Sequence, residues 1–321
     1  MNTIGVDVGG TKIAAGVVSP DGELLARVRR ETPAQDVDAI VVAITDAVGE
    51  LRGQHPVAGI GVAAAGYVDA GRSVVLFAPN PAWRDEPLRE KLEAAAGLPV
   101  LVENDANAAA WGEFRFGTGR DVDDMLMLTV GTGLGGGVVV DGELLTGAFG
   151  VAGELGHVRV VPDGIRCGCG NKGCWEQYAS GGALVREARE LARSGSLPAA
   201  RLLELAGGDP DAITGPQVTQ AAQEGDPSAQ ELLADLGRWL GEGCASMVAV
   251  LDPAMIVIGG GVAAAGELLL SPMRLAFRRH LTARGYRPEA PIVLASLGNT
   301  AGMIGVADLA ARSRVGLPDR Q

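Results

Sequence analysis

The chain has 321 residues, enough for two domains, because a single hydrophobic core stops growing near about 250–300 residues. Apolar residues make up 47% and charged residues 21%, a balance that excludes a disordered chain. The formal net charge of −12 disfavours nucleic acid as a partner, since DNA binding depends on Lys and Arg side chains that neutralise phosphates. The apolar run MVAVLDPAMIVI is interrupted by Asp252 and Pro253, so no membrane span is expected.

The N-terminal segment MNTIGVDVGG lacks the basic region and the cleavage site of an export signal. We therefore expect a cytoplasmic protein. In that reducing compartment, cysteines that lie close together are expected to bind a metal rather than to form disulfides.

The first motif is a glycine turn between two strands. Residues 3–8, TIGVDV, are apolar and β-branched and end in Gly9-Gly10-Thr11-Lys12. The segment IAAGVVS continues as a second strand and reaches the turn signal Pro20-Asp21-Gly22. Because a hairpin follows the glycines, and not a helix, the motif differs from a Walker A loop and from a dinucleotide-binding fingerprint.

The same arrangement occurs again at residues 125–145, MLMLTVGTGLGGGVVVDGELL. The segments VVSPDGELL (17–25) and VVVDGELL (138–145) are closely similar. Two related hairpins predict a duplicated fold with one glycine turn per lobe, the two turns facing each other across a cleft. A chance similarity between short hairpins rich in Val and Gly is the alternative.

Strands and helices alternate in the rest of the chain, which predicts an α/β fold with mainly parallel sheets. The expected elements are helix 36–52, strand 59–66, helix 88–96, strand 99–104, a helix from residue 105, a helical insertion over 182–249, strand 254–261, a helix over 262–281 and a last helix over 301–314. We expect the last helix to pack on the first lobe. Residues 1–108 and 301–321 would then form a small, discontinuous lobe, and residues 109–300 a large lobe.

Three glycine turns at strand ends, around Gly9, Gly131 and Gly259, offer backbone N–H groups that a phosphate can approach closely. The hydroxyls of Thr11 and Thr132 add two hydrogen-bond donors. Together the turns predict ATP bound between the lobes. The residues expected to contact ATP are Gly9, Gly10, Thr11, Lys12, Gly131, Thr132, Gly133, Gly259, Gly260 and Gly261.

Two acidic residues at strand ends are candidates for the chemistry. Asp7 precedes the first turn, where it would hold Mg²⁺, directly or through water; the alternative is a residue that only caps the turn. Asp105 lies where a strand becomes a helix, and its alternative role is an N-cap. Since ligands of open α/β sheets bind at the carboxyl ends of strands, the polar segment Glu103-Asn104-Asp105 favours a functional role. There Asp105 can accept a proton from a substrate hydroxyl during phosphoryl transfer.

Three of the four cysteines lie in the segment CGCGNKGC, as Cys167, Cys169 and Cys174, and His157 precedes them. Three thiolates and one imidazole are a closed tetrahedral set for zinc, which would be structural because no coordination position stays open. The alternative is a glycine-rich loop with unliganded thiols. Cys244 falls in a helical, apolar setting and is expected in the core.

Six motifs, in this order, resemble the ROK family of bacterial sugar kinases, most closely its ATP-dependent glucokinases. The resemblance covers essentially the whole chain. It implies the actin-like, hexokinase-type fold, in which two βαβ-based lobes enclose a cleft. The motifs are DVGGTK (7–12), ENDANAAAWGE (103–113), GTGLGGG (131–137), GELGH (153–157), CGCGNKGCWEQYASG (167–181) and IGGGV (258–262).

The resemblance also implies roles for single residues. Asp105 would be the general base that deprotonates the 6-hydroxyl of glucose, with MgATP as donor and glucose 6-phosphate and ADP as products. His157 would place one ring nitrogen on zinc and the other toward the sugar. The implied sugar contacts are Asn80, Asn104, Asp105, Glu154, His157 and Glu176.

Other functions remain open at this point. The sugar could be N-acetylmannosamine, fructose or allose, although WEQY after Cys174 resembles the glucose enzymes. Non-catalytic, sugar-sensing regulators of the family carry a DNA-binding helix-turn-helix before the first glycine motif, which here begins at Asp7. Polyphosphate-using relatives lack the cysteine segment, so ATP is the expected donor. An actin-like filament protein or chaperone would not need the cysteines. The resemblance also implies a homodimer or a tetramer.

Overall fold

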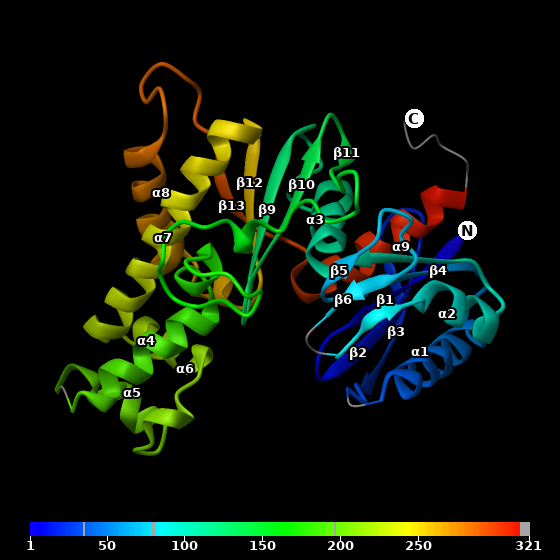
Figure 1. The fold of residues 1–321 in the computed structure, drawn as a ribbon, viewed down its shortest axis with the longest axis horizontal. Coiled ribbons are helices and arrows are strands. Elements are labelled where there is room, and N and C mark those ends of the chain that lie inside the picture. Colours follow the sequence, from blue (N-terminus) through cyan, green and yellow to red (C-terminus); the bar gives the residue numbers. More distant parts are fainter. Residues whose placement is uncertain (35, 79–80, 196, 315–321) are drawn as a thin grey trace. The chain divides into compact units, whose positions relative to one another are not determined.

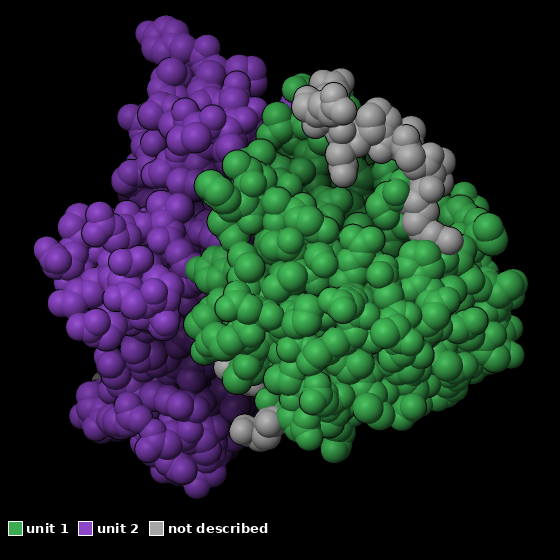
Figure 2. All heavy atoms as spheres, turned by 45° about the vertical axis from the view of Figure 1, so that its right-hand side comes forward, with its two compact units in different colours: residues 1–123, 137–153, 296–321 green, residues 124–136, 154–295 purple. Residues whose placement is uncertain are grey.

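A computed structural model describes residues 1–34, 36–78, 81–195 and 197–314. The chain forms two compact units, coloured separately in Figure 2, and each is described by itself. Unit 1 comprises residues 1–123, 137–153 and 296–321, and unit 2 comprises residues 124–136 and 154–295. The domain boundaries after residues 108 and 300 stay a prediction.

The main sheet of unit 1 has five strands in the order β3-β2-β1-β4-β8 (Figure 1). Strand β1 pairs antiparallel with β2 and parallel with β4, and β4 pairs parallel with β8. The strands are β1 (Asn2–Val8), β2 (Lys12–Val18), β3 (Leu24–Glu31), β4 (Val57–Ala64) and β8 (Val100–Asn104). A second, small sheet contains β5 (Tyr67–Val68), β6 (Val75–Phe77) and β7 (Arg84–Glu86). The hairpin predicted after the first glycine motif is confirmed.

Helix α1 (Val37–Arg52) follows from a capped start and a regular apolar face. The Asp36 side chain accepts a hydrogen bond from Ala39 N, which satisfies one of the free N–H groups of the first turn. Ile40, Ile44 and Val48 recur at helical spacing and are buried in the unit 1 core. Helix α2 (Leu88–Ala96) ends where Gly97 adopts the left-handed conformation, with φ 63°.

The last helix, α9 (Ala301–Arg314), packs on β1 and β4 of unit 1 and on α3 (Asp105–Phe116). Glycines make this close packing possible. A Cβ atom on Gly5 would lie 1.9 Å from the Met303 carbonyl oxygen, and one on Gly61 would lie 2.0 Å from the Val306 oxygen. Because real side chains cannot approach so closely, the sheet needs glycine where the helix crosses it.

Another five-stranded sheet of the same design, in the order β11-β10-β9-β12-β13, lies mostly in unit 2, while β11 and the end of β10 belong to unit 1. In each sheet, the first strand of a hairpin pairs parallel with a third strand, and that strand pairs parallel with a fourth, as in β1-β4-β8 and β9-β12-β13. The strands are β9 (Met125–Val130), β10 (Leu134–Val140), β11 (Glu143–Leu144), β12 (Met255–Gly259) and β13 (Ile292–Leu294), and the chain passes from unit 2 to unit 1 within β10. The shared strand order confirms the α/β prediction and the duplication inferred from the two hairpins.

Helices α7 and α8 form the largest helix pair of unit 2. Gly237 and Gly241 of α7 face the backbone of α8, and Cys244 is fully buried on α7, as the sequence predicts. The prediction of one helix over 262–281 is wrong in detail. A short 3₁₀ segment, Gly261–Ala265, ends at Gly266, where φ is 58°, and α8 starts after it. The helices are α4 (Gly181–Arg193), α5 (Ala200–Leu205), α6 (Gly215–Gln223), α7 (Pro227–Leu251) and α8 (Glu267–His280). Among the described residues, no helix is long and apolar enough to span a membrane.

Candidate functional site

The N-terminus of α3 presents Asp105 at the end of β8. The Asn104 side chain, and not that of Asp105, caps the helix, because its Oδ1 accepts hydrogen bonds from Ala106 N (2.9 Å) and Asn107 N (3.0 Å). The Asn104 Nδ2 group donates to Gly66 O at 3.0 Å. Asp105 therefore keeps an exposed carboxylate, whose Oδ1 accepts a hydrogen bond from the next amide, Ala106 N, at 2.9 Å.

Asp105 raises the pKa of Asp7 within unit 1. Loss of surrounding water raises the pKa of Asp7 to about 6, and repulsion from Asp105 adds to this effect. The Asp105 side chain is exposed, but nearby protein displaces part of its water, and this desolvation raises its pKa against the opposing hydrogen bond from Ala106. Two carboxylates with raised pKa at strand ends are typical of a site that binds a cation or moves a proton.

Glu103 does not join this site, although the sequence places it beside Asn104. Its side chain is buried, with Oε2 paired to Arg72 Nε at 2.9 Å. The Oε1 atom accepts from Asn104 N (3.0 Å) and Asn107 Nδ2 (3.1 Å). The alternation of a strand turns Glu103 away from the side chains that flank it, so its role is to fix the start of α3.

The first glycine turn closes the β1–β2 hairpin. Gly9 N donates to Lys12 O at 2.9 Å, and the Thr32 hydroxyl donates to Gly9 O at 2.7 Å. The side chains of Thr11 and Lys12 are exposed and have no partner among the described residues. This turn therefore offers one hydroxyl and one ammonium group to a ligand.

Unit 2 contains a cavity of about 960 Å³ beside the second and third glycine turns. Of the predicted ATP contacts, Gly131, Thr132 and Gly261 line it, and a cavity of this size can hold a small-molecule ligand. The start of α4 holds the second turn, since Gly181 N donates to Gly131 O (2.8 Å) and Gly182 N donates to Thr132 O (3.0 Å). Gly260 adopts φ 84° and packs against the Val130 backbone, which brings the third turn beside the second.

Much of this cavity wall comes from the segment that the sequence assigned only to a helical insertion. Helix α4 contributes Arg186, Arg189 and Arg193, and α6 contributes Thr219 and Gln220. The sequence did indicate a basic helix face here, because the three arginines recur at helical spacing on one face of α4. Their function was missed because spacing alone does not show which ligand or wall such a face meets.

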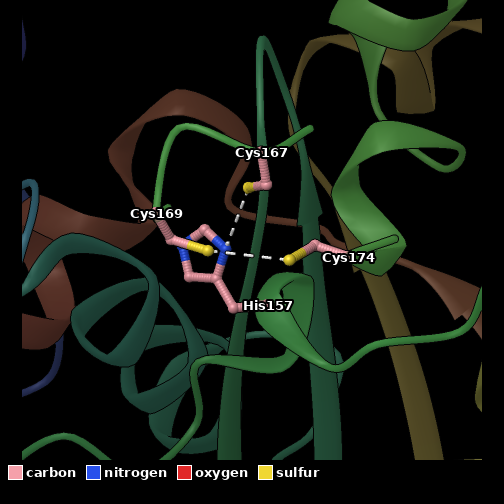
Figure 3. A group of neighbouring side chains, drawn as sticks. All are labelled: His157, Cys167, Cys169 and Cys174. Atoms are coloured by element: carbon pink, nitrogen blue, oxygen red, sulfur yellow. Dashed lines mark hydrogen bonds between the residues drawn. The ribbon is translucent and has the colours of Figure 1, made fainter. Parts of the chain in front are cut away.

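The four predicted metal ligands converge in unit 2 (Figure 3). Their ligand atoms all lie within 4.8 Å of one another. The Cys167 Sγ atom is 3.6 Å from His157 Nδ1, and the Cys169 and Cys174 Sγ atoms are 3.6 Å apart. A disulfide would need about 2.05 Å, so the cysteines are free thiols in a group that could hold a metal.

The loop backbone fixes this cluster. Trp175 N donates to Val158 O at 2.8 Å, and Gly173 N donates to Ile165 O at 2.8 Å. Gly173 has φ 76°, and a Cβ atom there would lie 1.6 Å from Val161 O, so no other residue fits. The Trp175 indole donates to Trp239 O at 2.9 Å and ties the loop to α7.

The three thiols differ in their pKa. Burial, followed by contacts with the neighbouring thiols, raises the pKa of Cys174 to about 12. Burial also raises the pKa of Cys167. For Cys169, burial opposes ionisation, but hydrogen bonds from Asn171 and the neighbouring thiols lower its pKa overall. Three thiolates at such short distances repel one another, so a cation would be needed to hold all of them ionised.

Two carboxylates flank the cluster. Glu154 Oε2 lies 4.0 Å from His157 Nε2, the ring nitrogen that faces away from Cys167. Glu176 Oε2 accepts from Leu134 N at 3.1 Å, and its Oε1 lies 3.9 Å from Cys167 Sγ. A Cβ atom on Gly133 would lie 2.4 Å from Glu176 Oε2, so the turn and the carboxylate are in close contact.

The predicted site residues thus form two groups. Unit 1 holds Asp7, Asn104 and Asp105, and unit 2 holds the metal cluster with Glu154 and Glu176. The predicted sugar contact Asn80 lies outside the described residues.

A family model described as "ROK family" matches residues 3–313. The chain belongs to the ROK family. A glucokinase from Streptomyces coelicolor is 51% identical over 308 residues, which cover 96% of this chain and 97% of that protein. An N-acetylmannosamine kinase from Escherichia coli is 38% identical over 308 residues, 92% of this chain and 98% of that protein.

A similar solved structure is that of a ROK family glucokinase from Streptomyces griseus in complex with glucose and AMPPNP. It has a TM-score of 0.90 and 52% sequence identity, and the match covers 97% of this chain and 100% of that chain. The actin-like fold predicted for this ROK chain is confirmed by that likeness.

The raised pKa of Asp7 predicts a pH-dependent cost to stability. The folded protein holds the proton more tightly than the unfolded chain does, so stability falls as pH rises from the unfolded value near 3.8 toward about 6. The unfolding free energy of Asp7→Asn minus that of wild type should increase by roughly 1 kcal/mol as the pH rises from 5 to 8. Urea unfolding in the absence of Mg²⁺ measures this difference. A constant difference across that range would contradict the shift.

Proposed function

We propose that the chain transfers the γ-phosphoryl group of ATP to the 6-hydroxyl of glucose. The observation that carries the proposal is the exposed Asp105 carboxylate, which Asn104 frees by capping α3, in a ROK chain 52% identical to a glucokinase whose structure contains glucose and AMPPNP. A base at this place is what the attack of a sugar hydroxyl on phosphorus requires.

Asp105 accepts the proton of the 6-hydroxyl as that oxygen forms a bond to the γ-phosphorus and the bond to the ADP oxygen breaks. A pKa above the usual range makes Asp105 the stronger base, provided that it remains ionised at the working pH. Asp7 holds Mg²⁺ of MgATP, directly or through water. This ion neutralises charge on the phosphates.

The sugar contacts that the family resemblance implies are retained in this proposal. Asn104 and Asp105 come from unit 1, and Glu154, His157 and Glu176 come from unit 2. His157 supports a dual role, because Nδ1 faces Cys167 while Nε2 faces Glu154. Asn80 is retained as a proposed contact on the resemblance alone.

ATP occupies the unit 2 cavity in this proposal. The backbone of the second and third glycine turns meets the nucleotide, and α4 and α6 enclose it. The first turn, with Thr11 and Lys12, contributes the contacts from unit 1. The proposed ATP contacts remain Gly9, Gly10, Thr11, Lys12, Gly131, Thr132, Gly133, Gly259, Gly260 and Gly261.

Zinc is the metal that we propose for the cysteine cluster. Two ligand atoms at about 2.3 Å from zinc and at a tetrahedral angle lie about 3.8 Å apart. The two sulfur–ligand distances of 3.6 Å fit that spacing. The ion would be structural, and its charge would stabilise the ionised thiols. Cytoplasmic location and assembly as a homodimer or tetramer also remain proposals.

The first test is a coupled ATP-consumption assay over glucose, fructose, allose, mannose, N-acetylglucosamine and N-acetylmannosamine, with polyphosphate as an alternative donor. We expect the highest kcat/KM with glucose and ATP. N-acetylmannosamine is the second candidate, because a kinase for that sugar is 38% identical to this chain. A preference for it would replace glucose, and no turnover with any sugar would exclude the kinase.

Replacement of the base should separate binding from turnover. We expect Asp105→Asn to lower kcat at least ~10²-fold and to change the glucose dissociation constant by less than about tenfold, since the amide keeps the shape but cannot accept the proton. The exposed Asp121→Asn is the control and should keep wild-type rates. Unchanged turnover in Asp105→Asn would exclude the general-base role.

The metal can be tested with the fourth cysteine as control. Elemental analysis should find about one zinc per chain in wild type and in Cys244→Ala, because Cys244 is buried on α7 and does not belong to the cluster. Cys169→Ser should lose zinc, unfold at a lower temperature and bind glucose more weakly, because zinc binding contributes to folding and orients His157. A metal-free, fully active wild type would exclude the site. Intact glucose affinity in Cys169→Ser would exclude the coupling through His157.

A further inference from the structure

Glu113 is a fully buried carboxylate on α3 that the proposed chemistry does not use. Its Oε2 accepts from Thr118 N (3.0 Å), Ser296 N (3.1 Å) and the Ser296 hydroxyl (3.1 Å). Its Oε1 accepts from Leu297 N at 2.6 Å. No cation pairs with Glu113 in the described part of the chain, so its charge is satisfied by N–H and O–H groups alone.

These donors lie on two connections between the units. Thr118 follows α3, shortly before the chain first leaves unit 1 after Asp123, and Ser296 is the residue at which the chain returns to unit 1 for the last time. The Glu113 carbonyl adds to the contact, because it accepts from Gly117 N (3.0 Å) and Gly119 N (2.9 Å). Glu113 therefore holds together the segment that leaves unit 1 after α3 and the segment that returns to unit 1 at Ser296.

The space around the carboxylate is restricted. A Cβ atom on Gly117 would lie 2.0 Å from Glu113 Oε2, so the outgoing segment passes directly over the oxygen. Only a carboxylate offers enough lone pairs for all these donors, since an amide of the same shape would turn an NH₂ group toward some of them. The contact thus depends on the charge of Glu113 and not only on its size.

The same helix carries Asp105 in its first turn. Glu113 is eight positions after Asp105, which is about 12 Å along an α-helix. Helix α3 is also packed tightly on α9, because a Cβ atom on Gly112 would lie 2.3 Å from Ala301 O and one on Gly305 would lie 1.8 Å from Ala108 O. The base and the two connections are therefore attached to one rigid element.

We propose that Glu113 is a positioning residue, which fixes these two connections to the helix that bears Asp105 and so holds that helix, and the base on it, in place. The kinetic part of the proposal rests on the proposed sugar-kinase function. The structural part does not, because it concerns contacts within unit 1 only.

The test compares Glu113→Gln with Trp111→Phe, a control on the same helix that removes one hydrogen bond, from the indole to Asp308 at 2.8 Å, away from the connections. In Glu113→Gln we expect hydrogen exchange at the amides of Thr118, Ser296 and Leu297 to become about tenfold faster or more. We also expect kcat to fall about tenfold and the glucose KM to rise. AMPPNP affinity without sugar, measured by calorimetry, should change less than the glucose KM does, since most of the proposed nucleotide contacts lie in unit 2 and Glu113 does not line its cavity.

The control should unfold at a lower temperature while its exchange at those amides and its kinetic constants stay within about twofold of wild type. Unchanged exchange in Glu113→Gln, or kinetic constants that match those of the control, would overturn the proposal. If Glu113→Gln does not fold, Ser296→Ala removes one donor and should show the same changes at about threefold; wild-type values there would overturn it. If wild type phosphorylates no sugar, the proposed function fails, and the exchange measurement alone decides whether Glu113 holds the connections.

Discussion

The free N–H groups at the start of α3 are the constraint on which the candidate site depends. A helix that begins at a strand end must satisfy these groups, and Asn104 does so with one side-chain oxygen. Because that position is filled, Asp105 keeps its carboxylate for a ligand. Glu103, on the opposite side of the strand, is buried with Arg72 and stabilises the same junction. Three consecutive polar residues thus have three different roles.

Near the opposite end of α3, backbone N–H groups are again satisfied by a side chain, here the carboxylate of Glu113 and not an amide oxygen such as that of Asn104. Glu113 satisfies backbone N–H groups of two connections, and its burial is tolerated because every partner is a donor. The glycines of α3 and α9 let the helices approach closely enough to make this element rigid. Helix α3 therefore carries the proposed base at one end and is fixed to two connections at the other, so the position of Asp105 is well defined.

In unit 2, the cysteine loop and the second glycine turn are joined by Glu176. Its carboxylate accepts from Leu134 N and lies beside Cys167. A metal in the cluster would therefore stabilise more than its own loop, since the loop also contacts α7 through Trp175. Within unit 2, the predicted sugar residues Glu154, His157 and Glu176 lie around one cluster, so a metal bound there would also hold these side chains in place.

The sequence by itself determined the α/β class, the duplicated hairpins and the metal set, because strand periodicity, turn residues and cysteine spacing are local and specific. The family motifs added Asp105 and its neighbours. Only the tertiary structure decided that Asn104 caps α3 and that Glu103 turns inward, since both depend on which strand and turn lie alongside. It also decided that α4 and α6 wall the unit 2 cavity and that Glu113 meets Ser296 across 183 positions of sequence. Such contacts leave no local pattern, because packing brings together residues whose separation in the chain carries no information about their distance in space.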